Sequence, residues 1–135
     1  MLIEIRKAIV AKLKTLDIKV IANEIKSGFD KPAFFIQSNL VNQDSDIDMN
    51  VNLVMLNIHY FSKDKTELDN LKMIEKLKKL FIVTLKTDSR VFTLTEKSYE
   101  IYDNVLQFKF SIRYTDENEV EENEPMQEIE FNQNI

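Results

Sequence analysis

One histidine and three alternating aspartates are the side chains whose types and spacing come closest to functional chemistry. His59 is the single histidine, and the chain contains no cysteine. An imidazole without a thiol, hydroxyl or carboxylate partner at ligand spacing is weak evidence for a metal site or a general base. We therefore expect His59 to have a structural or interfacial role, and we expect no enzymatic activity, no metal and no cofactor.

Asp44, Asp46 and Asp48 alternate within the polar stretch 42–50, as carboxylates do in calcium-binding loops. An EF-hand loop beginning at Asp44 requires glycine at its sixth position and glutamate at its twelfth. Met49 and Met55 occupy those positions. The stretch is therefore predicted to be a mobile, solvated loop, and its three aspartates are candidates for an interface with another protein.

Length and charge indicate one domain, residues 1–114, followed by an acidic tail, residues 115–135. The 135 residues include one Gly and two Pro, which excludes glycine-rich phosphate-binding loops. Residues 1–114 carry a net charge of +3, whereas the tail carries eight acidic and no basic side chains. Nucleic-acid-binding proteins normally present a basic face, so we expect no direct nucleic-acid binding. The longest apolar runs, such as 80–83, are too short to cross a membrane, and we expect no membrane contact.

Two segments have the 3.6-residue periodicity of amphipathic helices. The first covers residues 2–16, and the second runs to about residue 80 after a predicted capping box of Asp64 and Glu67. The predicted core positions are Ile5, Ile9, Leu13 and Leu16 in the first helix and Leu68, Leu71, Ile74, Leu77 and Phe81 in the second.

Strands are predicted by alternation and by β-branched or aromatic residues. The predicted strands are 18–21, 33–40, 51–61, 91–95, 96–102 and 105–114, with Asp103 and Asn104 as a two-residue turn. The strands on either side of residues 42–50 are expected to form a long hairpin. The expected fold is α+β, with a mainly antiparallel sheet of about four to six strands and two amphipathic helices packed on one face.

The strand 51–61 is apolar on both faces over part of its length. Val54, Leu56, Ile58 and Tyr60 form one face, and Val51, Leu53 and Met55 lie on the other. A second subunit that covers the second face would explain this pattern. Val51, Leu53 and Met55 are therefore further interface candidates.

The tail regains apolar residues after Pro125, namely Met126, Ile129, Phe131 and Ile135, of which the first three are the docking candidates. Three interpretations remain open: a disordered solubilising tail, an intramolecular strand, or a segment at 126–135 that docks on a partner. An acidic spacer followed by alternating apolar residues suits docking on a neighbouring protein, such as a sheath protein or another subunit.

The order of segments resembles the tail terminator proteins of phages and of phage-tail-like particles of Gram-positive bacteria. The resemblance covers about residues 5–114 and includes the segments IRKAIVAKLK, NEIKSGFDKPAFFI, NIHYF and VLQFKFSIRY. Its most specific positions are Glu24, Gly28, Phe29, Pro32, Phe34 and Phe35, together with Ile58, Tyr60 and Phe61. Members often carry basic residues before the Tyr-Phe pair, whereas this chain has Asp46, Asp48 and Asn50 there.

The resemblance implies a structural subunit that forms a hexameric ring on the end of a completed tail tube. Such a ring ends tube growth, holds the last sheath ring in contractile tails and offers a surface to the head connector. The implied partners are further copies of the chain, the tube protein, the sheath protein and a connector or collar protein. The implied location is the host cytoplasm during assembly, and then the phage tail or a headless bacteriocin particle.

An alternative function is a small, non-enzymatic binding or regulatory protein. The contrast between the +3 domain and the acidic tail motivates this hypothesis, because an acidic tail can capture a basic partner. Such binding would weaken steeply with added salt.

Overall fold

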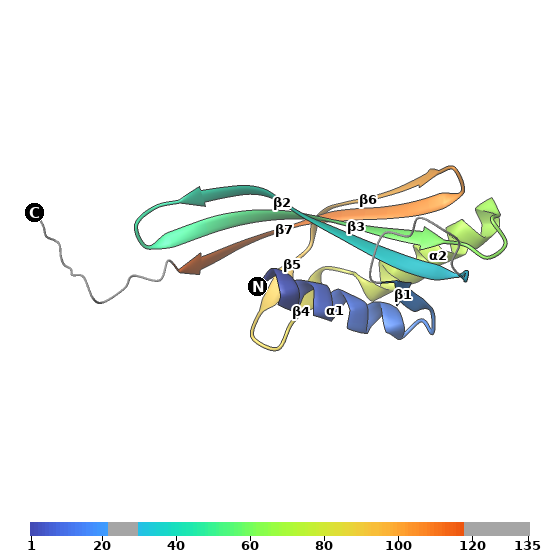
Figure 1. The fold of residues 1–135 in the computed structure, drawn as a ribbon, viewed down its shortest axis with the longest axis horizontal. Coiled ribbons are helices and arrows are strands. Elements are labelled where there is room, and N and C mark those ends of the chain that lie inside the picture. The colour runs from blue at the N-terminus through green and yellow to red at the C-terminus, as the bar shows by residue number, and fades with distance from the viewer. Residues whose placement is uncertain (22–29, 118–135) are drawn as a thin grey trace, which may run out of the picture.

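The computed structural model describes residues 1–21 and 30–117 (Figure 1). They form an α+β fold with two helices, a five-stranded sheet and a separate two-stranded ribbon. In chain order the elements are α1 (Leu2–Lys14), β1 (Lys19–Ile21), β2 (Ala33–Ser45), β3 (Met49–Phe61), α2 (Glu67–Leu80), β4 (Thr84–Lys86), β5 (Val91–Thr93), β6 (Thr95–Tyr102) and β7 (Val105–Glu117). The predicted α+β class, the two helices and the mostly antiparallel sheet are confirmed.

The five-stranded sheet has the strand order β1-β2-β3-β7-β6. β1 runs parallel to β2, and the other neighbouring strands are antiparallel. β3 and β7 pair from Met49 opposite Glu117 to Phe61 opposite Val105. The β3–β7 pair is therefore thirteen residues long, and both of its strands lie in the interior of the five-stranded sheet.

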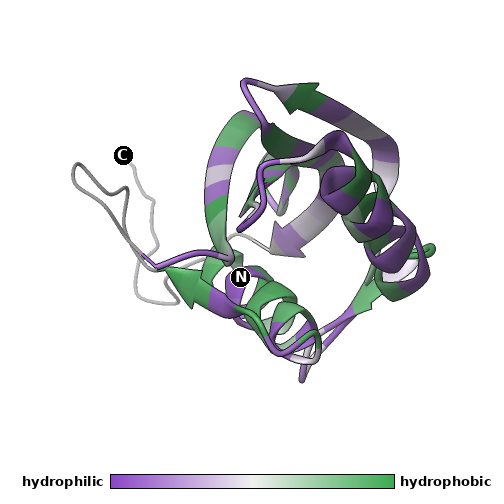
Figure 2. Ribbon diagram, turned by 90° about the vertical axis from the view of Figure 1, so that its right-hand side faces the viewer, coloured by the Kyte–Doolittle hydropathy of each residue, from purple (hydrophilic) through white to green (hydrophobic). Residues whose placement is uncertain are grey.

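One face of the sheet contributes to the hydrophobic core, because side chains alternate between the two faces of a strand. The core residues from the three long strands are Phe34, Ile36, Val54, Leu56, Ile58, Tyr60, Leu106, Phe108, Phe110, Ile112 and Tyr114. The same cluster contains Ile5, Ile9 and Leu13 of α1 and Met73 and Leu77 of α2. Figure 2 shows the corresponding alternation of hydrophobic and hydrophilic residues along the strands and around the helices.

The predicted loop at 42–50 is wrong, because β2 and β3 continue through most of it. Residues 46–48 alone connect the two strands. A bulge at Val41 separates the pair Leu40–Val54 from the pair Asn42–Leu53. The extra residue reverses the face to which later β2 side chains point, so the sequence loses its alternation although the strand continues.

We call residues 39–45, 49–55 and 111–117 the arm, which consists of the distal parts of β2, β3 and β7. Figure 1 shows the far end of the arm extending beyond the N-terminus of α1. Within the described chain, β1 pairs only with residues 33–35 of β2, and β6 reaches along β7 no further than Ser111. Beyond Ser111, both edges of the arm therefore lack a paired neighbouring strand in the described part of the chain.

The predicted apolar face of the second helix is wrong at its start. Leu68 and Leu71 are 61% and 46% exposed, whereas Asn70 is fully buried. The buried side-chain amide of Asn70 donates a hydrogen bond to the carbonyl oxygen of Asn104, at 3.4 Å. An apolar periodicity cannot reveal a core position that a polar residue occupies, so the predicted face was rotated.

The capping box of Asp64 and Glu67 is also wrong. α2 begins at Glu67, and Thr66 is its N-cap. The Thr66 hydroxyl oxygen accepts a hydrogen bond from the Asp69 backbone N–H at 3.1 Å. Threonine satisfies an N–H group that the first helical turn leaves free, which is the usual role of this residue type.

The last strands differ from the prediction in their boundaries. β4 was missed, because three residues are too few to show alternation. Asp103 and Asn104 form the predicted turn, and their φ angles of 52° and 62° are those a tight hairpin needs. β7 ends at Glu117, beyond the predicted end at Tyr114.

Candidate functional site

The face of the sheet opposite the core carries the candidate interface residues of β3. Val51 and Leu53 are half-buried and Met55 is 45% exposed. None of the three belongs to the core cluster of the described residues. They are therefore apolar side chains on the outer face of the sheet, in one row along the arm.

Cross-strand pairing places polar and charged residues on both sides of this row. Val51 pairs with Asp44, Leu53 with Arg113, and Met55 with Ser111. The bulge at Val41 brings Asp44 to this face. A shallow groove of about 190 Å³ adjoins the row, with Gln37, Asn39, Met55, Leu56, Asn57 and Lys109 as its lining.

Asp46 and Asp48 lie at the tip of the hairpin, apart from the row. The Asp46 carboxylate accepts hydrogen bonds from the backbone N–H groups of Met49 and Asp48, both at 2.9 Å. These bonds favour the charged form and lower the pKa of Asp46 below its usual value. The structure therefore brings Asp44 to the apolar row, whereas Asp46 stabilises the turn between the strands.

His59 lies on the same outer face, nearer the other end of β3. Its Nε2 atom is 3.4 Å from the side-chain oxygen of Gln37. Its ring lies 5.6 Å from the ring of Phe35 and 6.4 Å from the ring of Phe61, measured between centroids. Partial burial, and then the positive charge of Lys109, lower the pKa of the imidazole. These surroundings favour a neutral ring packed between aromatic side chains.

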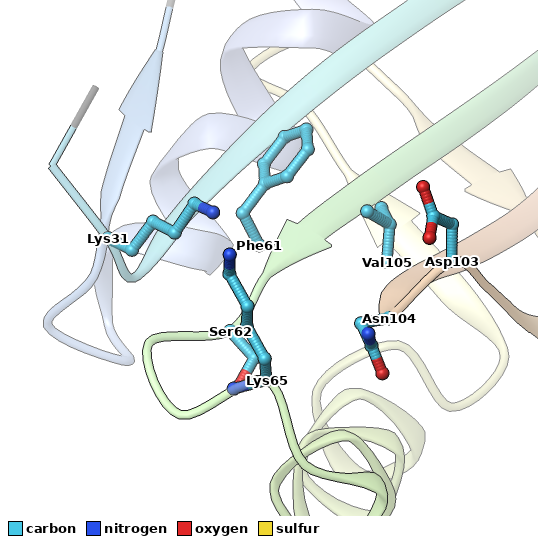
Figure 3. Close-up of a pocket in the computed structure, with 7 residues that line it drawn as sticks. All are labelled: Lys31, Phe61, Ser62, Lys65, Asp103, Asn104 and Val105. Carbon is cyan, nitrogen blue, oxygen red and sulfur yellow. The ribbon is translucent and has the colours of Figure 1, made fainter. Parts of the chain in front are cut away.

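A pocket of about 320 Å³ lies where β3 ends and β7 begins (Figure 3). Lys31 and Lys65 approach each other on one side of it, and Asp103 and Asn104 lie on the other. Partial desolvation and the charge of Lys65 lower the pKa of Lys31. The lining contains two amines, a carboxylate and a hydroxyl, Ser62, but no imidazole to serve as a base.

The exposed apolar residues of the arm were missed by the sequence prediction. Leu40, Val41 and Met49 are 48%, 50% and 42% exposed, and Ile47 at the tip is 84% exposed. Ile47 and Met49 are visible in the sequence as apolar residues inside the predicted loop at 42–50, and Leu40 and Val41 directly precede it. Exposed apolar residues that gather at one end of a sheet are typical of a protein interface.

Several predicted residues lie outside the described part of the chain. These are the docking candidates Met126, Ile129 and Phe131 and the motif residues Glu24, Gly28 and Phe29. Of the motif residues that are described, Phe34 and Tyr60 pack in the core with ring centroids 5.3 Å apart. Phe35 and Phe61 lie beside His59 on the outer face.

Across residues 1–21 and 30–117, no group of three or more His, Asp or Glu side chains is arranged to hold a metal ion. Neither α1 nor α2, the two helices of that part, has the length and apolarity that a bilayer crossing requires.

Comparison with known proteins gives one family. No curated protein matches the chain. The sequence model of the family described as "Phage tail terminator protein" matches residues 4–124, which is most of the chain and includes all the described strands. Members of this family are structural components of the tail and interact with other tail proteins. The chain therefore belongs to the phage tail terminator protein family.

Proposed function

We propose that this terminator subunit assembles as a hexameric ring on the end of the tail tube. The ring ends polymerisation of the tube, holds the last sheath ring and presents a surface to the head connector. Assembly takes place in the host cytoplasm, and the ring then remains in the tail of a phage or phage-tail-like particle. Family membership favours this function over a regulatory protein with an acidic tail.

The observation that carries the proposal is the apolar outer face of the arm. Val51, Leu53 and Met55 form a row there, next to a sheet edge with exposed Leu40 and Val41. Burial of apolar surface contributes roughly 25 cal/mol per Å², so a neighbour that covers this face gains much of its binding free energy there. Each subunit uses its arm to contact the next subunit of the ring.

Charged side chains beside the row determine how two neighbouring subunits are oriented in this contact. Asp44 lies beside Val51, and Arg113 lies beside Leu53 on the opposite strand. Repeated contacts between unlike surfaces of identical subunits produce a closed ring when the rotation between subunits closes. The opposite charges of Asp44 and Arg113, on either side of the row, suit such a head-to-tail contact.

Leu53→Asp tests the proposed interface. The variant replaces an apolar side chain of the row by a carboxylate beside Arg113, and covering that charged pair with a neighbouring subunit requires costly desolvation. We expect the subunit to stay folded and ring assembly to be lost. Light scattering coupled to size exclusion, with negative-stain images in the presence and absence of tube, measures assembly. Circular dichroism checks the fold.

Leu68→Asp is the matched control, because Leu68 is 61% exposed on α2 and lies outside the arm. It introduces the same charge and should leave assembly unchanged. Rings formed by Leu53→Asp at the wild-type concentration would show that the row is not the interface.

A further inference from the structure

Helix α1 has an exposed face that combines apolar and basic side chains. Ile3 is 70% exposed, Val10 is half-buried and Ala11 is exposed. Lys7 and Lys14 are also exposed, and Arg6 reaches the carbonyl oxygen of Ile36 at 3.3 Å. These six residues line a shallow groove of about 440 Å³ along the helix. A ligand that fits it has apolar side chains between negative charges.

The end of β7 is connected to the first turn of α1 through two consecutive residues of the turn between β4 and β5. The Ser89 hydroxyl donates a hydrogen bond to the Glu4 carboxylate at 2.8 Å. The Arg90 guanidinium donates to the Thr115 carbonyl oxygen, also at 2.8 Å. The chain therefore leaves the described fold, after Glu117, at a strand end that this turn connects to the N-terminal end of α1.

The chain that follows has the composition that the groove fits. Residues 118–135 contain six Glu and no Lys or Arg, and Glu128 and Glu130 alternate with Ile129 and Phe131. Residues 118–125 span up to roughly 28 Å when extended. A thirteen-residue helix is about 20 Å long, so this spacer is long enough to bring residues 126–135 along the groove.

We propose that, in the free subunit, residues 126–135 dock on the α1 groove of the same chain. Ile129 and Phe131 cover Ile3, Val10 and Ala11, and Glu128 and Glu130 lie near Lys7 and Lys14. The proposal is independent of the proposed ring, since it concerns the surface of a single subunit. A tail protein that binds the C-terminal segment first has to displace it from α1.

Photo-crosslinking of the full chain tests this docking. The chain has no cysteine, so Asn132→Cys gives a single site for benzophenone maleimide. Benzophenone-labelled chain that contains only ¹⁴N is mixed with an equal amount of benzophenone-labelled chain that contains ¹⁵N. The mixture is irradiated and digested, and the crosslinked peptides are identified by mass spectrometry. We expect crosslinks to peptides from residues 1–14, with both peptides of each crosslink carrying the same isotope.

Charge reversal then tests the recognition. Lys7→Glu with Lys14→Glu should cause loss of the α1 crosslinks, because attraction becomes repulsion. Lys76→Glu with Lys79→Glu is the matched control on the exposed face of α2 and should leave them unchanged. Ile129→Asp should also cause loss, and it leaves the described fold untouched. In 1 M salt, where charges are screened beyond about 3 Å, the crosslinks should decrease.

Crosslinks to the sheet or to α2 in place of α1 would overturn the proposal. Crosslinks to α1 that join peptides of different isotopes would show docking on another copy, and would also overturn it. The crosslinking is done at a concentration at which light scattering shows single subunits, so that neighbours in a ring cannot supply either result.

Discussion

At the scale of single residues, Asp69 connects helix α2 to strand β3. Its carboxylate accepts hydrogen bonds from the Tyr60 hydroxyl, at 3.1 Å, and from the Ser62 hydroxyl. Tyr60 and Ser62 are 3% and 2% exposed, so water cannot readily replace this acceptor. Burial, and then the Asp69 bond, raise the pKa of Tyr60 well above its usual value.

We predict that Asp69→Ala lowers the free energy of unfolding by about 1–3 kcal/mol, because two buried hydroxyl groups lose their acceptor. Urea unfolding followed by circular dichroism measures the change. Asp64→Ala removes an exposed carboxylate just before α2 and should change stability little. Equal losses in the two variants would contradict the role assigned to Asp69.

His59 provides a second prediction at this scale, because the pKa of its ring is lowered by burial and by Lys109. The single histidine gives an unambiguous NMR titration, and we expect its midpoint below the ordinary value of 6.5. Lys109→Gln should raise the midpoint only part of the way, because burial is the larger cause.

The sign of the linked stability follows from this pKa. As the pH falls, His59 in the unfolded chain binds a proton near the ordinary pKa of 6.5, whereas His59 in the folded chain binds it only at a lower pH. His59 therefore makes its full contribution to the free energy of unfolding above pH 6.5, and this contribution decreases as the pH falls below that value. A midpoint at or above 6.5 would show that the ring is not desolvated as described.

At the scale of elements, the bulge at Val41 determines how the arm presents its outer face. Leu40 pairs with Val54 and Asn42 pairs with Leu53, so removal of Val41 lets every cross-strand pair persist. The bend and extra twist that a bulge gives to a strand would be lost. Under the proposed function, the shape of the arm must match the next subunit.

We predict that deletion of Val41 leaves the subunit folded but abolishes ring assembly. Thermal unfolding and light scattering measure the two properties separately. Val41→Thr keeps the bulge and reduces only the apolar character, so it should retain assembly better than the deletion. Normal rings from the deletion variant would show that the bulge has no part in assembly.

At the scale of the whole molecule, the arm and the C-terminal segment 126–135 are separate regions of one chain. The arm contains the apolar row proposed to join subunits, and the sequence 126–135 lies beyond the last described strand. The two surfaces can therefore be removed independently.

We predict that a chain ending at Pro125, ten residues shorter than the full subunit, still forms rings of six subunits but attaches more weakly to sheath. The truncated chain loses Met126, Ile129 and Phe131, which are the docking candidates of this segment, together with Ile135. Cosedimentation with purified sheath particles measures the attachment, and light scattering measures the ring. Attachment equal to that of the full chain would exclude a role for the segment.

The sequence by itself determined the elements with strong periodicity and the family. Ile5, Ile9 and Leu13 at helical spacing, and the alternation from Leu106 to Tyr114, identified α1 and β7. Local turn chemistry at Asp103 and Asn104 was equally clear. These features are visible because each depends on interactions within one element or one turn.

Only the tertiary structure decided which face of α2 is buried and where the hairpin turns. Asn70 occupies a buried position, and its amide reaches the carbonyl oxygen of Asn104, thirty-four positions away. Beyond the bulge at Val41, β2 continues through polar residues because Asn42, Gln43, Asp44 and Ser45 each pair with a residue of β3. Both features depend on partners in another element, which the pattern within one segment does not contain.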